Sequence, residues 1–204
     1  MGKFLLGIIV TLVALILVAL GVATLGLFPT AANVEPSHLE RHFAMGAVDA
    51  SMDRHAPRVT NPLMPNDQNL IDGMKLYTMN CALCHGGLDR KPSTLANSFY
   101  PPPPNLVSDP PDDPEWHIFY TIRTGVRYTG MPAWDKTLPP PDMWKITMFL
   151  SHMDKLPPAV QQYWKTSFGT SPEPENKEGM KDLSHDPNYE KGHDKDHDKD
   201  KDRH

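Results

Sequence analysis

The chain has 204 residues, 25 acidic against 20 basic side chains and a formal net charge of -5 at pH 7. This balance excludes a strongly basic nucleic-acid binder, and the sequence contains no basic stripe with interleaved aromatic residues. Twenty-two prolines cluster between the apolar stretches, which favours a compact domain with few long elements.

The amino-terminal segment is apolar from Phe4 to Phe28 and carries no charge. As a helix it is long enough to cross a hydrocarbon core about 30 Å thick. A cleavable signal peptide is the alternative, with Thr30-Ala31-Ala32 as a weak cleavage site, but its apolar region is normally only about 7 to 15 residues long. We therefore predict that residues 1–28 form an uncleaved transmembrane anchor.

Basic residues indicate how this anchor is oriented. Lys3 precedes the apolar run, whereas the next Lys or Arg after it is Arg41. Because basic residues favour the cytoplasmic side of a membrane, the amino terminus is expected in the cytoplasm and the rest of the chain outside.

Residues 29–66 are predicted to form a stalk that contains one short amphipathic helix. Ser37 followed by Glu40 is typical of a capping box. Apolar residues then recur at helical spacing as far as Pro57, namely Leu39, Phe43, Ala47 and Ala50. We interpret this helix as a spacer that packs on a neighbour or on the membrane surface, without a chemical role of its own.

Residues 67–166 have the pattern of a mostly helical domain. Asp67 is the expected cap of a helix in which Gly73 lets another helix approach closely. Asp113 and Pro114 are the expected cap and first residue of a second helix. A third follows the prolines at 139–141, and no alternating strand pattern is present.

Beyond the domain, residues 167–204 are charged and almost free of apolar residues, so this His-containing tail is predicted to be disordered, with weak metal binding as the alternative.

The most informative motif is Cys81-Ala82-Leu83-Cys84-His85, because two thiols and an imidazole at this spacing are what covalent attachment of a c-type haem requires. The thiols form thioether bonds, and His85 becomes the proximal iron ligand. A zinc site needs four ligands, and a thioredoxin-like redox pair needs a parallel sheet. A Cys81–Cys84 disulfide leaves His85 without a role. The motif therefore predicts one covalently bound haem c.

Further motifs follow in an ordered series: Pro104-Asn105-Leu106, Gly125-Val126-Arg127 and Gly130-Met131-Pro132-Ala133-Trp134. With the haem motif, this series resembles a class I cytochrome c over roughly half of the chain. The resemblance implies an all-α fold of a few short helices and long loops around the haem, here preceded by a single transmembrane helix. It also implies Met131 as the sixth iron ligand, for which a soft thioether is suited. Bis-histidine ligation through His117 or His152 is the alternative.

Three more residues are candidates to surround the haem. In the resembled family a proline carbonyl accepts a hydrogen bond from the proximal histidine, and Pro104 is the matching position. Arg127 and Trp134 flank Met131 and are candidates to bind the haem propionates, with Arg123 as an alternative to Arg127.

These expectations define a function. The resemblance implies a membrane-anchored, non-enzymatic carrier of single electrons, which cycles between Fe(II) and Fe(III) and exchanges electrons with membrane redox complexes. Its expected location is the bacterial cytoplasmic membrane, with the haem domain on the periplasmic side. The alternatives are a fixed haem subunit of a larger oxidoreductase, and a haem enzyme or gas sensor with an open iron position.

Overall fold

The computed structural model describes residues 2–27, 30–91 and 93–172, and every regular element in these ranges is helical. This confirms the predicted all-α fold class. The α-helices are α1 (Gly2–Thr24), α2 (His38–His55), α3 (Asp67–Asn80), α4 (Ala82–His85), α5 (Glu115–Thr124), α6 (Pro140–Ser151) and α7 (Pro158–Phe168). Two short 3-10 turns, η1 (Ala96–Ser98) and η2 (Met153–Lys155), complete the series.

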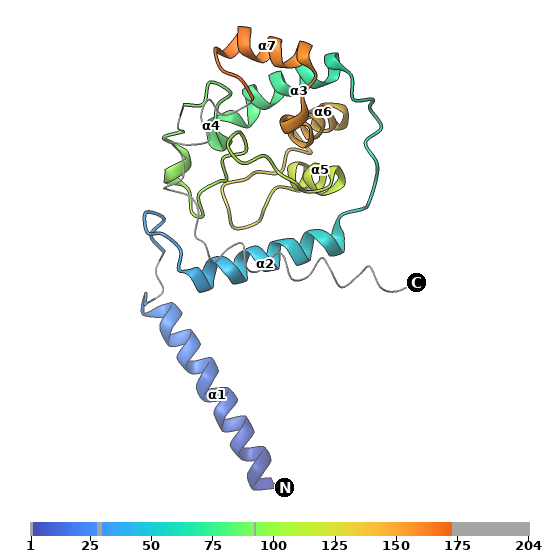
Figure 1. Cartoon of the computed structure of the whole chain (residues 1–204). Coiled ribbons are helices and arrows are strands. Elements are labelled where there is room, and N and C mark those ends of the chain that lie inside the picture. Colours follow the sequence, from blue (N-terminus) through green and yellow to red (C-terminus); the bar gives the residue numbers. More distant parts are fainter. Residues whose placement is uncertain (1, 28–29, 92, 173–204) are drawn as a thin grey trace, which may run out of the picture.

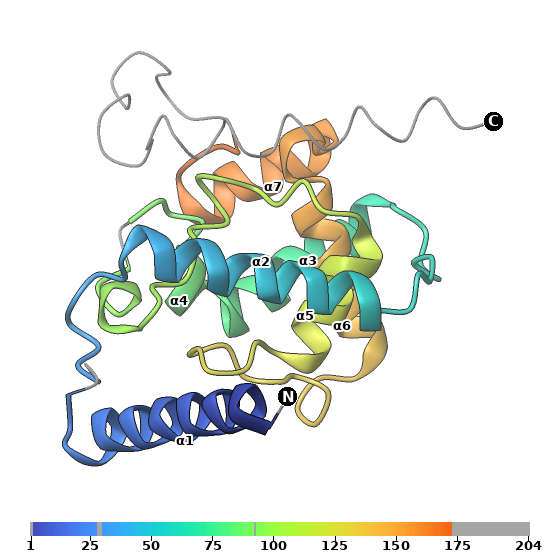
Figure 2. The same cartoon turned by 90° about the horizontal axis from the view of Figure 1, so that it is seen from below.

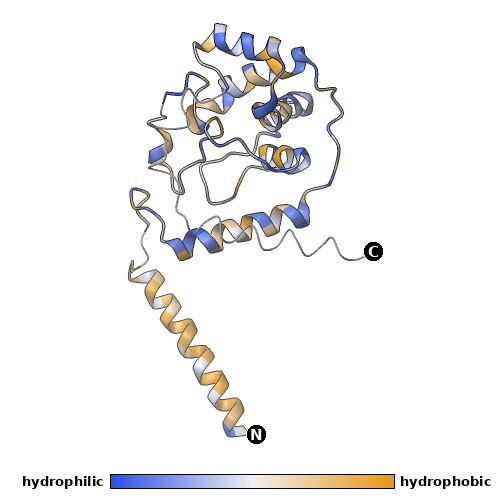
Figure 3. Ribbon diagram, viewed as in Figure 1, coloured by the Kyte–Doolittle hydropathy of each residue, from blue (hydrophilic) through white to orange (hydrophobic). Residues whose placement is uncertain are grey.

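Helix α1 projects away from the rest of the protein (Figure 1) and is apolar along almost its whole length (Figure 3). It has 23 residues, an 18-residue stretch within it has a mean hydropathy of 3.1, and none of its residues is buried. At 1.5 Å per residue it is roughly 34 Å long, which matches the hydrocarbon thickness of a bilayer. By length and composition, α1 is suited to be the single transmembrane helix that the sequence predicts.

Helix α2 lies along the base of the domain, on the side from which α1 projects (Figure 1), and crosses in front of α5 and α6 when seen from below (Figure 2). Its cap is the predicted one, because Ser37 Oγ accepts a hydrogen bond from Glu40 N at 3.2 Å. The helix is attached to the domain at both ends. Glu40 accepts a hydrogen bond from the hydroxyl of Tyr100, and Met52 is buried near the other end.

The core of the domain forms where α3 crosses α6 and α5 packs beside them. The prediction that Gly73 permits a close helix contact is confirmed: a Cβ at this position would lie 2.1 Å from Lys145 O. An ion pair of 2.9 Å between Asp72 and Lys145 joins the same two helices. Phe119 of α5 stacks on Trp144 of α6 with ring centroids 3.8 Å apart. These contacts fix the three helices relative to one another and so fix the ends of the loops between them.

Two of the predicted helix caps are wrong by one residue. Helix α3 is capped by Asn66, whose side chain accepts a hydrogen bond from Asn69 N at 2.9 Å, and Asp67 is the first helical residue. Helix α5 begins at Glu115 because Pro114 has an extended backbone with ψ 145°. The carboxylate of Asp113 is therefore too early in the chain to cap the helix, and it lies 3.2 Å from the ring of His117 instead.

Helix α7 was not expected from the sequence. It inserts Val160 and Trp164 into the core, both with no exposed surface. Trp164 Nε1 donates a hydrogen bond of 3.1 Å to Leu88 O, just after the haem motif, and Thr170 Oγ1 donates to the same carbonyl. Arg90 donates hydrogen bonds to the carbonyls of Ser171 and Pro172, so residues up to 172 contact the domain. The predictions made for residues 173–204 lie outside the described residues.

Candidate haem-attachment site

The Cys-X-X-Cys-His segment is a single helical turn directly after α3. Cys81 ends α3 through a hydrogen bond of its amide to Tyr77 O at 2.8 Å, and His85 N then bonds to Cys81 O at 2.8 Å. This turn brings both thiols and the imidazole together. The thiols are free and half-buried, and no disulfide joins them. Burial raises the pKa of the Cys81 thiol to about 12, with the neighbouring Cys84 as a smaller contribution.

The imidazole of His85 is oriented by a backbone carbonyl, because its Nδ1 lies 3.0 Å from Pro104 O. A carbonyl can only accept, so Nδ1 carries the proton and Nε2 keeps its lone pair. Burial lowers the pKa of His85, and the hydrogen bond to Pro104 partly offsets this effect. The ring is therefore held in the neutral tautomer that a metal-ligating histidine requires.

The backbone of His85 is also fixed. Its carbonyl accepts hydrogen bonds from Leu106 N and from the Tyr77 hydroxyl, each at 3.0 Å. The same hydroxyl lies 2.9 Å from Gly86 O, and Tyr77 has no exposed surface. The sequence gives no signal for this role of Tyr77, because the pattern of apolar positions does not show where a hydroxyl points.

Gly86 and Asn105 form a tight contact that holds the segment of Pro104 beside the haem motif. Gly86 has φ 94°, and a Cβ there would lie 2.4 Å from Asn105 Oδ1. That oxygen accepts hydrogen bonds from Val107 N at 3.1 Å and Ser108 N at 3.2 Å. Only glycine fits this position, and the asparagine keeps the following turn closed.

Met131 lies at the end of a compact loop that follows α5. Val126 N bonds to Met131 O at 3.2 Å, which closes the loop. Inside it, Thr129 Oγ1 donates to Val126 O at 2.8 Å and accepts from Met131 N at 3.1 Å. The Met131 side chain is half-buried and packs against the hydrophobic core. Thr129 thus fixes the backbone that presents Met131, a role that sequence reasoning missed.

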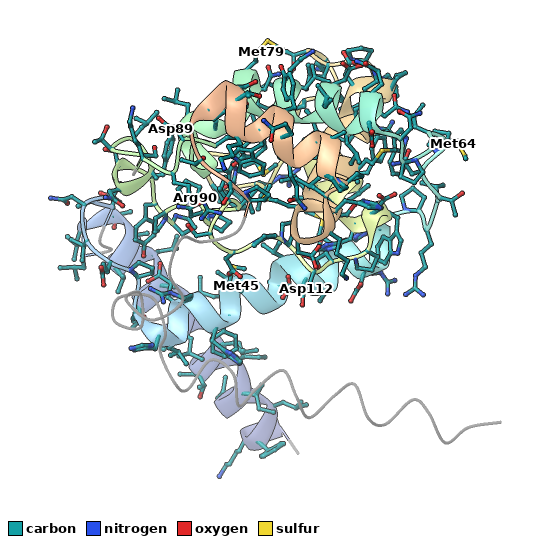
Figure 4. All side chains as sticks on the ribbon, turned by 45° about the horizontal axis from the view of Figure 1, so that its top comes forward. Met45, Met64, Met79, Asp89, Arg90 and Asp112 are labelled. Carbon is teal, nitrogen blue, oxygen red and sulfur yellow. The ribbon has the colours of Figure 1, made fainter. Side chains whose placement is uncertain are left out.

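The other methionines have different surroundings. Met143, Met148 and Met153 are at most 2% exposed and belong to the core. Met64 and Met79 project from the surface (Figure 4) and are 76% and 71% exposed. Met131 is on a loop beside the core and differs from both groups.

The remaining predicted residues are less constrained. Arg127 and Arg123 are exposed, and Trp134 is half-buried with its amide bonded to Ile122 O at 3.3 Å. The alternative ligands have partners elsewhere: His117 contacts Asp113, and His152 Nδ1 lies 3.0 Å from Met148 O. The predicted contact of Trp134, Arg127 and Arg123 with the haem propionates therefore stays a prediction.

The donor set fits a covalently attached haem. Two adjacent free thiols, an imidazole with a fixed neutral tautomer and a loop-borne thioether are the groups that such a cofactor uses. Within the described ranges there is no cluster of three or more His, Cys, Asp or Glu side chains that could hold a metal ion by itself.

Comparison with protein families gives a match in the central part of the chain. Residues 68–150 match the family described as cytochrome C oxidase, cbb3-type, subunit III. Searches of curated proteins and of solved structures found no match. The matched segment begins within α3 and ends within α6, so it includes the haem motif and Met131, while α1, α2 and α7 lie outside it.

Proposed function

We propose that this chain is a membrane-anchored carrier of single electrons, in which a cytochrome c domain holds one covalently bound haem c. The chain has only two cysteines, both in the haem motif, which supports one haem for each chain. The main support for electron transfer is the combination of an imidazole of fixed orientation at His85 with a loop that presents the Met131 thioether.

In this proposal, Cys81 and Cys84 attach the haem, and His85 and Met131 are its axial ligands. When bound, the haem supplies a site that is reduced and oxidised by one electron. Pro104 O accepts a hydrogen bond from Nδ1 of His85, so the lone pair of Nε2 would be free to bind the iron. Thr129 fixes the Met131 backbone, so little rearrangement accompanies a change of charge. Occupation of both axial positions excludes small molecules, which argues against an enzyme or gas sensor.

Arg127 and Trp134 are the proposed propionate partners, with Arg123 in reserve for Arg127. A guanidinium forms strong hydrogen bonds to a carboxylate, and the indole N–H is a further donor. The exposed position of Arg127 allows it to move toward a propionate at the edge of the haem.

The membrane location rests on α1, with Lys3 on the cytoplasmic side and the haem domain on the outer, periplasmic side of a bacterial cytoplasmic membrane. Tethering raises the effective concentration of the haem near membrane redox complexes, which are the proposed donor and acceptor. The name of the matched family favours a second candidate, namely a fixed haem subunit of a membrane oxidase.

Absorption spectra of the haem-loaded protein test the ligand set. Oxidised, reduced and carbon monoxide-treated samples are compared for wild type, Met131→Ala and the surface control Met79→Ala. We expect wild type and Met79→Ala to be low-spin and indifferent to carbon monoxide, and Met131→Ala to bind it. Ready binding by wild type would overturn the electron carrier in favour of an open iron site.

Solubilisation in mild detergent separates the two membrane roles. A carrier elutes alone, whereas a fixed subunit copurifies with the other chains of its complex. Scrambling the order of the apolar residues in α1 is tolerated by a lipid-facing anchor, and it disrupts a complex in which α1 packs on other helices.

A further inference from the structure

Helix α2 has two apolar stripes on opposite sides. The inner stripe faces the domain and consists of Val48, Met52 and the following Ala56, the last two only 7% exposed. The outer stripe consists of the predicted amphipathic positions Leu39, Phe43, Ala47 and Ala50, all exposed. At about 100° for each residue, the centres of the two stripes are roughly 170° apart. The packing of α2 on the domain therefore leaves the outer stripe uncovered.

The bulky members of the outer stripe lie at the end of α2 that is nearest to α1 in the chain. Leu39 is 68% exposed and Phe43 is 67% exposed. Exposed apolar side chains continue back along the connection to the anchor, with Leu25 at 75%, Leu27 at 66% and Val34 at 61%. Several large exposed apolar side chains on neighbouring segments of the chain indicate a contact with something apolar.

The connection to the anchor limits what this surface can reach. The 13 residues from 25 to 37 separate α1 from α2 and span at most roughly 45 Å when fully extended. Helix α2 lies on the side of the domain that faces α1 (Figure 1). The connection therefore keeps α2 close to the lipid bilayer that α1 is proposed to cross.

The attachment of α2 to the domain gives this surface a fixed orientation. The Tyr100 hydroxyl holds Glu40 near the start of the helix, and Met52 and Ala56 are buried at its end. Arg54 follows at the far end of the outer stripe, where a guanidinium can contact lipid phosphate. A helix with an apolar outer side and charged flanks is suited to the boundary between headgroups and acyl chains.

We infer that the outer stripe of α2, led by Leu39 and Phe43, rests in the membrane interface and holds the haem domain against the bilayer in one orientation. This rests on the proposed anchoring by α1. The occupant is lipid, since the stripe continues the apolar path of the anchor and its other members are small alanines without a pocket for a partner side chain.

Cysteine modification in lipid nanodiscs tests the inference with the full, haem-loaded chain. Both native thiols are used by the haem, so Phe43→Cys and Asp49→Cys each carry one reactive thiol. Both positions are exposed in the structure, and Asp49 lies outside the outer stripe. In discs of phosphatidylcholine and phosphatidylglycerol that hold one copy, we expect a membrane-impermeant maleimide to modify position 43 at least tenfold more slowly than position 49.

Equal rates in single-copy discs would overturn the lipid contact while leaving the anchor intact. Protection that occurs only in discs with two copies would overturn it in favour of contact between copies. Protein that does not enter the discs would overturn the anchoring proposal and this inference with it. Leu39→Cys provides a second reading if Phe43→Cys alters the haem spectrum, and it is expected to be protected in the same way.

Discussion

Removal of the Tyr77 hydroxyl tests whether its hydrogen bonding to the backbone of the haem motif stabilises the domain. Tyr77→Phe removes this group and keeps the aromatic ring, which lies 5.7 Å from the ring of Phe149. The hydroxyl lies 3.0 Å from His85 O and 2.9 Å from Gly86 O. The substitution therefore leaves the apolar packing unchanged and removes only the polar contact with the two carbonyls.

The expected change in the free energy of unfolding depends on which hydrogen-bond donors the two carbonyls keep after the substitution. His85 O keeps its hydrogen bond from Leu106 N at 3.0 Å. Gly86 is buried, and the structure describes no second donor for its carbonyl. A buried carbonyl without a partner costs about 1 to 3 kcal/mol. We expect Tyr77→Phe to lower the free energy of unfolding by about 2 kcal/mol.

Guanidinium unfolding of the haem-loaded chain in detergent measures this change, with haem absorbance and circular dichroism as the two signals. Tyr128→Phe is the matched control because Tyr128 is 91% exposed, and we expect it to change the free energy of unfolding very little. A loss below about 0.5 kcal/mol for Tyr77→Phe, or a loss equal to that of the control, would refute the reasoning.

Three further predictions concern the helices around the site. Gly73→Ala places a Cβ 2.1 Å from Lys145 O, so we expect thermal unfolding to show a loss of roughly 2 kcal/mol or more, whereas Gly46→Ala, with open space around it, is neutral or slightly stabilising. The hydrogen bond from Lys145 holds the pKa of the Asp72 carboxyl below its ordinary value. Asp72→Asn should therefore cost about 0.5 to 1 kcal/mol in denaturant unfolding at neutral pH. Thr147 is fully buried and its hydroxyl has no partner, so Thr147→Val should raise the free energy of unfolding by about 1 kcal/mol in the same assay.

The sign of the Asp72 effect can be checked by pH. A carboxyl with a lowered folded-state pKa stabilises the protein above its unfolded pKa, and this stabilisation is lost as the pH falls through the folded value. The difference between wild type and Asp72→Asn should be constant from about pH 5 to 7 and shrink below about pH 4. A difference that persists at pH 2, equal losses for Gly73→Ala and Gly46→Ala, or a less stable Thr147→Val would contradict these predictions.

The haem motif and the helical class could be predicted because they depend on local patterns. The spacing of Cys81, Cys84 and His85 is diagnostic by itself, and the apolar spacing of α3 and α6 agrees with the helices observed. The caps were displaced by one residue because Asn66 and Asp67 are both good caps, and sequence alone does not distinguish them.

Other features depend on contacts that the sequence does not display. Helix α7 has only Val160 and Trp164 as buried positions, and its polar remainder resembles the start of the charged tail. The sequence does not distinguish Thr129 from other loop residues, because its role depends on the hydrogen bonds of its hydroxyl to Val126 and Met131. The inner stripe of α2 was missed because the stronger apolar pattern of Leu39 and Phe43 indicated the opposite side.

The hydrogen bond between Trp164 and Leu88 joins residues 76 positions apart and brings the end of the domain back to the loop behind the haem motif. In the proposed topology the amino-terminal part of the chain would cross the membrane first, so Leu88 and Arg90 would reach the outer side before their partners at 164–172. Until α7 arrives, the loop beside Cys81 and Cys84 has neither of its carboxyl-terminal contacts. In that topology the two thiols would be available for haem attachment before α7 completes the fold.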